Sequence, residues 1–273
     1  MNTAELRGDY SRAAPDYSVE QDWSVYSADD HALYRRLFER QSRLVPRYAC
    51  PEWIAAIAGL DAARQIPKFE AVSRSLKSRT GWEIVAVPGL IPDDAFFTHL
   101  ANRRFPVTVW LRRPEEFDYI VEPDVFHDFF GHVPLLFDRT YADHLYEYGK
   151  GGLKAMRLDA VKMLARLYWF TIEFGLIKSR SGIRAYGAGI LSSGGELVYC
   201  VDDPKPRRLA FDLERVMRTD YQIDRYQDPY FVIDSFEHLL RATAPDFAPI
   251  YARLKALPAI DAGAAAPGDR LAR

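Results

Sequence analysis

The sequence has few cysteines and no long uninterrupted hydrophobic run, and each scarcity excludes a class of protein. Two cysteines among 273 residues, Cys50 and Cys200, cannot form a disulfide framework, which indicates a reducing compartment. The longest apolar stretch, residues 164–177, is interrupted by Arg166 and Glu173 and is unsuited to span a membrane. The first residues are polar and do not resemble a signal peptide. We therefore expect a cytoplasmic protein.

An excess of one charge is also missing. The chain has 36 Lys and Arg against 38 Asp and Glu, a formal net charge of −2. Nucleic acids and anionic membranes attract basic surfaces, so we expect neither as a partner. Apolar residues make up 48% of the sequence and aromatic residues 14%, which is ample for a large core. No internal repeat or long linker divides the chain.

The apolar pattern predicts a mainly α domain with small β elements. Residues 1–26 are polar with scattered tyrosines, and we expect an extended N-terminal arm there. The periodic pattern of a folded domain occupies residues 27–257. Residues 258–273 are rich in Ala and Gly, and we expect a disordered tail.

Helices are expected where apolar residues recur at helical spacing, and strands where short β-branched or aromatic runs end at turn residues. The expected helices begin at Ser27 (with Asp30 as its capping partner), Pro51, Pro67 and Pro92, and cover residues 138–150, 158–179, 209–218 and 236–257. The expected strands cover residues 82–87, 107–111, 186–191, 197–201 and 230–233. A break is expected at the glycines of residues 149–152.

Two of the six histidines, His127 and His132, lie five residues apart among apolar neighbours. Before them, Pro123 and Asp124 suit the first turn of a helix, and after them we expect a helix end caused by Gly131 and Pro134. Five residues turn about 140° past a shared α-helical face. We therefore expect the second histidine in a loosened last turn, where both imidazoles can reach one metal ion.

Glu173 is the best candidate for a third ligand, because it lies within the most apolar predicted helix. A buried carboxylate is costly unless it is paired or bound to a metal. Two imidazoles and one carboxylate form the facial arrangement of non-haem ferrous oxygenases, which leaves positions open for O2 and substrate. Alternatively, the histidines are ordinary core residues, and the carboxylate pairs with Arg166 or Arg157.

Zinc hydrolysis is the rival metal chemistry. The zincin pattern has histidines at i and i+4, with Glu directly after the first. Here the step is five residues and Asp128 follows the first histidine, which disfavours zinc without excluding it.

Two further segments are candidate binding sites. Gly89, Leu90 and Ile91 follow a predicted strand, and their backbone could bind a flat polar heterocycle on which Phe96 stacks. Arg112 ends another predicted strand, and its guanidinium suits an amino-acid carboxylate. The alternatives are an ordinary loop and a surface arginine.

Four motifs, at residues 123–134, 168–176, 185–193 and 195–200, resemble the pterin-dependent aromatic amino acid hydroxylases. The similarity is greatest to bacterial members that act on phenylalanine, and it spans roughly residues 15–255. This resemblance implies a single basket-like catalytic domain, mainly helical with small β elements. It also implies a monomer, because the oligomerisation helix of animal members has no counterpart here.

The resemblance assigns roles residue by residue. The iron(II) ligands would be His127, His132 and Glu173. The tetrahydropterin would be held by Gly89, Leu90, Ile91, Phe96, Asp128 and Tyr168. The substrate would be held by Arg112, Trp169, Ser192 and Ile223.

The implied reaction is hydroxylation of L-phenylalanine to L-tyrosine with O2, iron(II) and a tetrahydropterin. Asp128, Pro106 and Ile120 depart from animal members, which have Glu, His and often Thr at these positions. Ile223 matches a position that is acidic in tyrosine hydroxylases, and an apolar side chain there suits phenylalanine. The alternatives are hydroxylation of tryptophan or tyrosine, a zinc hydrolase, and a non-catalytic amino-acid-binding protein.

Overall fold

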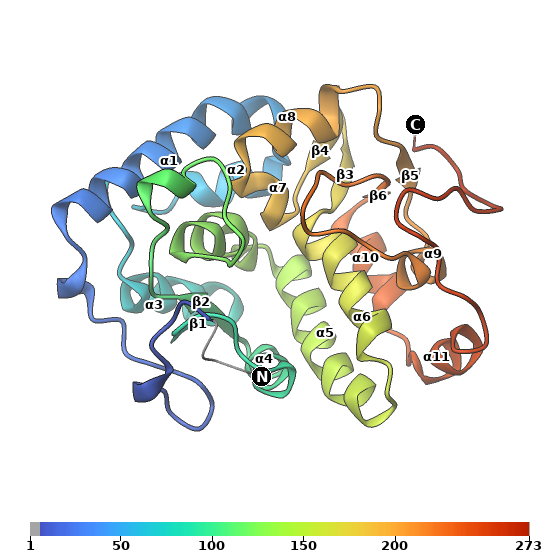
Figure 1. Ribbon diagram of the computed structural model, residues 1–273, viewed down its shortest axis with the longest axis horizontal. Helices are drawn as coiled ribbons and strands as arrows, with labels where there is room; N and C mark the ends of the chain where they lie inside the picture. Colours follow the sequence, from blue (N-terminus) through green and yellow to red (C-terminus); the bar gives the residue numbers. More distant parts are fainter. Residues whose placement is uncertain (1–5, 273) are drawn as a thin grey trace.

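Helices dominate the computed structural model, which describes residues 6–272, and small sheets flank them (Figure 1). This confirms the expectation of a mainly α fold with small β elements. The α-helices of this part of the chain are α1 (Ala28–Tyr48), α2 (Pro51–Ala58), α3 (Phe69–Thr80), α4 (Asp93–Leu100), α5 (Arg139–Arg157), α6 (Val161–Tyr168), α7 (Ala188–Ser192), α8 (Gly194–Asp202), α9 (Leu213–Arg218), α10 (Phe236–Thr243) and α11 (Ala248–Leu254).

The strands form two separate sheets. The first pairs β1 (Glu83–Val87) with β2 (Arg104–Thr108) in parallel. The second has the order β4-β3-β6-β5 and comprises β3 (Leu176–Ser179), β4 (Gly182–Ala185), β5 (Arg208–Ala210) and β6 (Tyr230–Ile233). In Figure 1 the first sheet lies with α3 and α4 on the left, and the second lies toward α9 and α10 on the right. The strands expected at residues 82–87 and 230–233 are confirmed. The strand expected at 107–111 is displaced toward the N-terminus, because β2 begins at Arg104 and ends at Thr108.

The start of α1 follows from its capping residues. The Ser27 side chain accepts a hydrogen bond from the Asp30 amide at 3.1 Å, and the Asp30 carboxylate accepts one from the Ser27 amide at 2.8 Å. These reciprocal bonds satisfy two amides that have no partner within the helix. The buried face of α1 then carries Leu33, Tyr34 and Leu37. The expected capping pair is confirmed.

The break expected at residues 149–152 is wrong, because α5 continues through it. A Cβ on Gly149 would lie 2.6 Å from Cβ of Leu100, and one on Gly152 would lie 2.1 Å from the Phe97 ring. The missing side chains therefore let α4 pack directly on α5. Tertiary packing offsets the poor helix propensity of glycine here.

Two expected strands are helices. Residues 186–191 contribute mostly to α7, and residues 197–201 belong to α8. Ser193 caps α8 by accepting a hydrogen bond from the Glu196 amide at 3.2 Å. Short apolar runs that are buried on several sides carry no periodicity that separates strand from helix.

The long helix expected at residues 158–179 is divided. It comprises α6, the π-helical segment η7 (Trp169–Glu173) and β3. The helix ends before Gly175, where a Cβ would lie 2.2 Å from the Thr171 carbonyl oxygen. Likewise, residues 209–218 form most of β5 and then α9, and residues 236–257 form α10 and α11.

The described part of the tail, to Ala272, is placed against the domain, which differs from the disorder expected from composition. Leu271 forms a β-bridge with Leu209, and the amide of Ala272 donates to the Arg208 carbonyl at 2.8 Å. Asp269 pairs with Arg215 at 2.8 Å. The tail has few large apolar residues, and backbone pairing and a salt bridge hold it against the domain instead. Arg273 lies outside the described residues.

The described part of the N-terminal arm contains two short 3-10 turns, η2 (Tyr10–Arg12) and η3 (Trp23–Val25). It runs along the first sheet, where the Val19 amide donates to the Ala86 carbonyl at 2.9 Å. The indole of Trp23 donates to the Ile66 carbonyl at 2.8 Å. Residues 1–5 lie outside the described residues.

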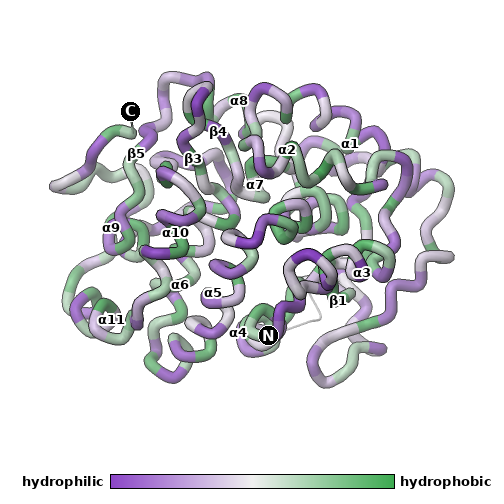
Figure 2. Tube along the Cα trace, turned by 180° about the vertical axis from the view of Figure 1, so that it is seen from behind, coloured by the Kyte–Doolittle hydropathy of each residue, from purple (hydrophilic) through white to green (hydrophobic). Residues whose placement is uncertain are grey.

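Hydropathy varies over short distances along the helices. Figure 2 shows hydrophilic and hydrophobic residues interleaved in most elements, as in amphipathic helices that pack on a core. Among residues 6–272, no helix is both long enough and apolar enough to cross a membrane.

Candidate metal centre

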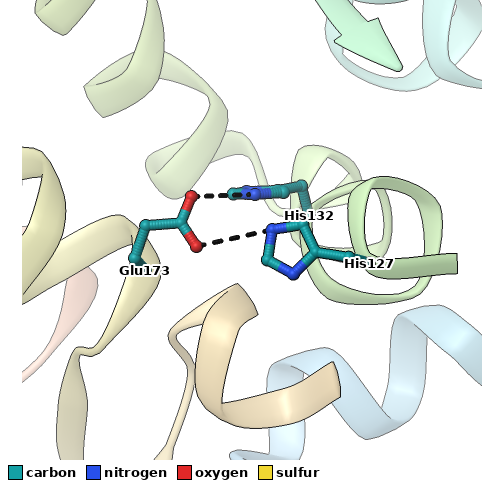
Figure 3. A group of neighbouring side chains, drawn as sticks. All are labelled: His127, His132 and Glu173. Atoms are coloured by element: carbon teal, nitrogen blue, oxygen red, sulfur yellow. Dashed lines mark ion pairs between the residues drawn. The ribbon is translucent and has the colours of Figure 1, made fainter. Parts of the chain in front are cut away.

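His127, His132 and Glu173 converge on one point (Figure 3). One carboxylate oxygen of Glu173 lies 3.6 Å from Nε2 of His127, and the other lies 3.2 Å from Nε2 of His132. The possible ligand atoms of the three residues all lie within 4.8 Å of one another. Within residues 6–272 this is the only group of three or more His, Cys, Asp or Glu that could hold a metal ion.

Two π-helical segments bring these side chains together. His127 and His132 are the first and last residues of η5 (His127–His132), and Glu173 ends η7. In a π-helix the hydrogen bond runs from residue i to i+5, so residues five apart lie one hydrogen-bonded turn apart and closer to a shared face than in an α-helix. The loosened turn expected around His132 is therefore a π-helical turn that includes both histidines.

The helix end expected from Gly131 and Pro134 agrees with the structure, since η5 ends at His132. A Cβ on Gly131 would lie 2.7 Å from Cβ of Ala188 in α7. The glycine thus permits close packing of α7 against the histidine segment. Pro134 begins a new 3-10 turn, η6 (Pro134–Phe137).

Ser192 fixes the orientation of the first histidine. Its hydroxyl lies 2.8 Å from the carbonyl oxygen of Ala188, which can only accept, and 2.9 Å from Nδ1 of His127. The single hydroxyl proton goes to the carbonyl, so the imidazole donates from Nδ1 and carries its lone pair on Nε2. That nitrogen faces Glu173, as a metal ligand must.

The charge of the cluster suits a divalent cation. Burial opposes ionisation of Glu173, but the nearby imidazoles hold the pKa of its carboxyl below its ordinary value. Arg166, a possible partner of this carboxylate in the sequence, instead donates to Asp220 and to the Met217 carbonyl. Two imidazoles and one carboxylate therefore fit a metal ion with further coordination positions for other ligands.

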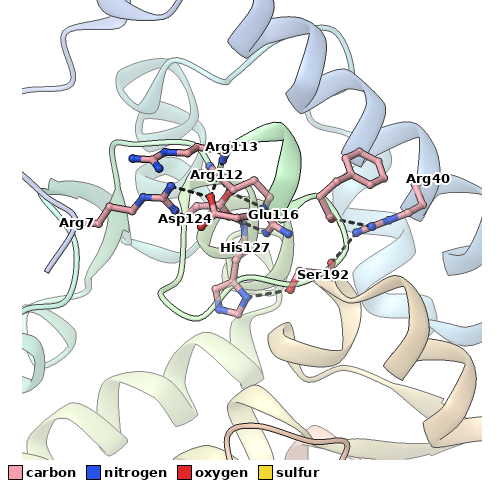
Figure 4. Close-up of polar contacts among 9 residues, drawn as sticks. Arg7, Arg40, Arg112, Arg113, Glu116, Asp124, His127 and Ser192 are labelled. Atoms are coloured by element: carbon pink, nitrogen blue, oxygen red, sulfur yellow. Dashed lines mark hydrogen bonds and ion pairs between the residues drawn. The ribbon is translucent and has the colours of Figure 1, made fainter. Parts of the chain in front are cut away.

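Arg112 is buried and paired, not a surface arginine. Its Nε and Nη2 donate to the two oxygens of Asp124 at 2.8 and 2.9 Å (Figure 4). Asp124 also accepts from the amide of His127 at 2.9 Å, which makes it the cap just before the first helical turn, whereas the sequence predicted it within that turn. The Arg112 side chain therefore lies next to the histidine segment, η5. No hydrogen bond of its Nη1 is found among residues 6–272, which leaves this nitrogen available to a ligand.

Asp128 connects the histidine segment to the first sheet. Its carboxylate accepts from the amide of Thr108 at 2.8 Å, and Thr108 pairs with Val87 at the end of β1. After Val87, the chain continues into the loop Gly89–Ile91, for which the sequence predicts binding of a heterocycle. Burial raises the pKa of the Asp128 carboxyl.

Tyr10 holds this loop from the N-terminal arm, a contact that the sequence did not reveal. Its hydroxyl donates to the carbonyl of Leu90 at 2.7 Å. A Cβ on Gly89 would lie 2.9 Å from the same hydroxyl, so any larger residue there would require the Tyr10 hydroxyl to shift. The side chain of Leu90 is exposed.

Aromatic rings connect this region to the metal ligands. Phe96 meets Tyr168 edge to face, with ring centroids 5.6 Å apart, and the ring of Tyr168 lies 6.4 Å from that of His132. The structure thus brings two predicted pterin residues, Phe96 and Tyr168, to the candidate metal-binding cluster.

Trp169 and Ile223, two predicted substrate residues, form no side-chain hydrogen bond to the three candidate metal ligands. The Trp169 indole stacks on Tyr221 at 4.2 Å and donates to Gln227 at 2.9 Å. Ile223 is 65% exposed in the loop of residues 219–229, and its carbonyl accepts from the Tyr119 hydroxyl. The structure does not bring the Ile223 side chain into the cluster. Sequence reasoning missed Gln227, because a single polar residue in a loop carries no recognisable signal.

A mainly helical domain with a largely buried cluster of two histidines and one carboxylate is typical of metal-dependent enzymes of the facial-triad class. The sequence model of the family described as biopterin-dependent aromatic amino acid hydroxylase matches residues 4–251. The chain belongs to this family.

Relatives and solved structures agree with this assignment. The chain is 55% identical over 260 residues to phenylalanine-4-hydroxylase of Chromobacterium violaceum, which covers 95% of this chain and 88% of that protein. It is 54% identical over 256 residues to phenylalanine-4-hydroxylase of Ralstonia nicotianae, covering 93% and 82%. A crystal structure of the C. violaceum enzyme bound to cobalt matches with a TM-score of 0.93 at 54% identity, covering 98% and 96%.

Proposed function

We propose that this chain hydroxylates L-phenylalanine to L-tyrosine with O2, iron(II) and a tetrahydropterin. The convergence of two imidazoles and one carboxylate carries the proposal. Family membership supports the pterin, and relatives named phenylalanine-4-hydroxylase, at 49–55% identity over at least 93% of this chain, support the substrate.

His127, His132 and Glu173 would hold the iron(II) by two neutral nitrogens and one carboxylate. Bound together, the metal and the pterin supply the electrons that activate O2 for attack on an aromatic ring. Ser192 would keep the lone pair of His127 directed at the metal, because its hydroxyl accepts a hydrogen bond from Nδ1–H. Asp124 orders the start of the histidine segment through the amide of His127.

The pterin would be held by Gly89, Leu90 and Ile91 through their backbone, by Phe96 through stacking, and by Asp128 and Tyr168 beside the metal ligands. Contacts of Asp128 with β2 and of Phe96 with Tyr168 support this arrangement. These aromatic side chains would also exclude water from the reaction.

The substrate carboxylate would bind the free Nη1 of Arg112, whose position is fixed by Asp124. Trp169 would contact the substrate ring. Ser192 was also predicted to hold the carboxylate, and its observed bond to His127 supports a role in orienting the metal ligand as well. Ile223, which is exposed, stays a prediction, as do a monomeric state and a cytoplasmic location.

The test is anaerobic reconstitution with ferrous iron, followed by O2, 6-methyltetrahydropterin and each aromatic amino acid in turn, with products identified by mass. We expect tyrosine from phenylalanine, and loss of both iron and tyrosine formation in His132→Ala. Full activity of that variant, or activity that needs zinc and neither O2 nor pterin, contradicts the proposal. Preferential turnover of tryptophan or tyrosine would retain the chemistry but change the substrate. Phenylalanine binding without turnover would identify a binding protein.

A further inference from the structure

Gln227 is a buried amide with all its side-chain polar atoms paired. It lies near the end of the loop of residues 219–229, which joins α9 to β6, and is 5% exposed. Its Oε1 accepts from Nε1 of Trp169 at 2.9 Å. Its Nε2 donates to the carbonyls of Gln222 and Arg225 at 2.9 and 3.0 Å. One side chain therefore joins the interior of the loop to the indole of Trp169.

A second buried group fixes the backbone of Gln227. Glu196, on α8, accepts from the Gln227 amide at 3.1 Å and from the Tyr230 hydroxyl at 2.6 Å. Glu196 is 6% exposed, and its carboxylate bonds to none of the three predicted metal ligands. Gln227 is thus held from the α8 side while it holds the loop.

Trp169 connects this arrangement to the metal centre. It begins η7, the segment that ends with Glu173. Its indole lies between Tyr221 of the same loop, at 4.2 Å and 12°, and Phe174, at 4.6 Å. The position of the indole is therefore set by one hydrogen bond and two ring contacts.

We propose that Gln227 is a positioning residue that fixes the Trp169 indole and the loop of residues 219–226 as one wall of the substrate site, and so sets the affinity for aromatic amino acids. Gln227 touches neither the reacting atoms nor the metal ligands. The inference rests on the proposed function, because it assumes that Trp169 faces the substrate. Without the amide, the indole N–H and two loop carbonyls lose their partners, and unpaired buried polar groups favour rearrangement toward water.

The test compares Gln227→Met, which keeps the length of the side chain but removes its hydrogen bonds, with Gln65→Met. Gln65 lies outside the loop of residues 219–229, and its side chain is exposed. Binding of L-phenylalanine to the iron-loaded protein is measured by calorimetry, alongside tyrosine formed per pterin oxidised. We expect about tenfold weaker binding and poorer coupling in Gln227→Met, and changes below twofold in Gln65→Met.

A double-mutant cycle shows whether Gln227 acts through the indole. In a Trp169→Phe background, which lacks the N–H donor, Gln227→Met should weaken binding by less than threefold. Glu196→Gln keeps an acceptor for the Gln227 amide and should bind as the wild type does. Iron content should be the same in every variant. If Gln227→Met does not fold, Gln227→Asn, which retracts the amide by one methylene, should show the same direction of change.

The inference is overturned if Gln227→Met or Gln227→Asn folds and binds phenylalanine with wild-type affinity, or if its effect is equally large without the Trp169 indole. Failure of the proposed function looks different, since the wild type would then form no tyrosine. The wild type could bind phenylalanine without forming tyrosine, and Gln227→Met could still weaken that binding; this result would support the role of Gln227 but not the proposed function. A wild type that does not bind phenylalanine would overturn both.

Discussion

The hydroxyl of Ser192 lies 2.9 Å from Nδ1 of His127 and thereby selects the tautomer that leaves Nε2 free for a metal. The two residues are 65 positions apart and meet because Gly131 lets α7 pack against η5. Figure 4 shows the same histidine between Ser192 and the Arg112–Asp124 pair. His127 is therefore held through both its ring and its backbone.

Removing this hydroxyl should weaken metal binding. In Ser192→Ala the imidazole loses the acceptor that fixes its tautomer, and we expect a 10–100-fold lower affinity for iron(II), measured by anaerobic titration. Ser193→Ala is the matched control, because Ser193 caps α8 instead. It should cost about 1 kcal/mol of stability and leave iron affinity unchanged. Equal iron affinities in the two variants would contradict the assigned role of Ser192.

Asp124→Asn should destabilise the fold strongly. It leaves the buried Arg112 guanidinium without its charged partner, and removing one member of a buried pair costs about 3–5 kcal/mol. Urea unfolding measures the loss. Asp118→Asn is the control, because Asp118 is 92% exposed and pairs with Arg40 at 3.3 Å. Its effect should be at most about 1 kcal/mol. A loss that small in Asp124→Asn would show that the pair contributes little.

Glu196 should make stability depend on pH. Burial raises the pKa of its carboxyl to about 7 from an ordinary value of 4.5. Between these values the unfolded chain releases the proton and the folded chain keeps it, so the free energy of unfolding falls as pH rises. The free energy of unfolding of the wild type minus that of Glu196→Gln should fall by about 3 kcal/mol from pH 4.5 to 7 and stay constant above pH 7. A difference that does not change over this range would refute the shift.

Two neighbouring glycines of α5 should respond oppositely to alanine. A Cβ on Gly152 would lie 2.1 Å from the Phe97 ring, whereas one on Gly151 would meet nothing within 4 Å. Gly152→Ala should lower the free energy of unfolding by about 1–3 kcal/mol through overpacking. Gly151→Ala should raise it by about 0.5–1 kcal/mol, because alanine is the better helix former. Thermal unfolding measures the stability of the two variants. Equal changes in stability would exclude close packing of α4 on α5.

The expected elements were reliable where a local rule applies. The Ser27–Asp30 capping box, the strand at residues 230–233 and the helix that begins at Pro51 depend on chemistry within a few residues. Residues 186–191 and 197–201 were misread as strands, because burial on several sides hides the periodicity. The glycines of α5 were misread as a break, since the helix that covers them is about fifty residues away in the sequence.

The site divides in a similar way. Sequence reasoning proposed His127, His132 and Glu173 as metal ligands, and the structure brings the three together. It proposed Arg112 as a carboxylate-binding group but did not find its pairing with Asp124. It did not find Tyr10 or Gln227, whose partners Leu90 and Trp169 are distant in the chain.

By itself, the sequence determined the donor chemistry of the site, the family resemblance and the mainly helical character, because residue identity and local spacing encode these directly. Only the tertiary structure decided how His127 and His132, five residues apart, both point toward Glu173. That outcome needs a π-helical turn, a glycine against which α7 packs, and Ser192 to choose the tautomer. Each of these depends on contacts between distant segments, which local preferences do not specify.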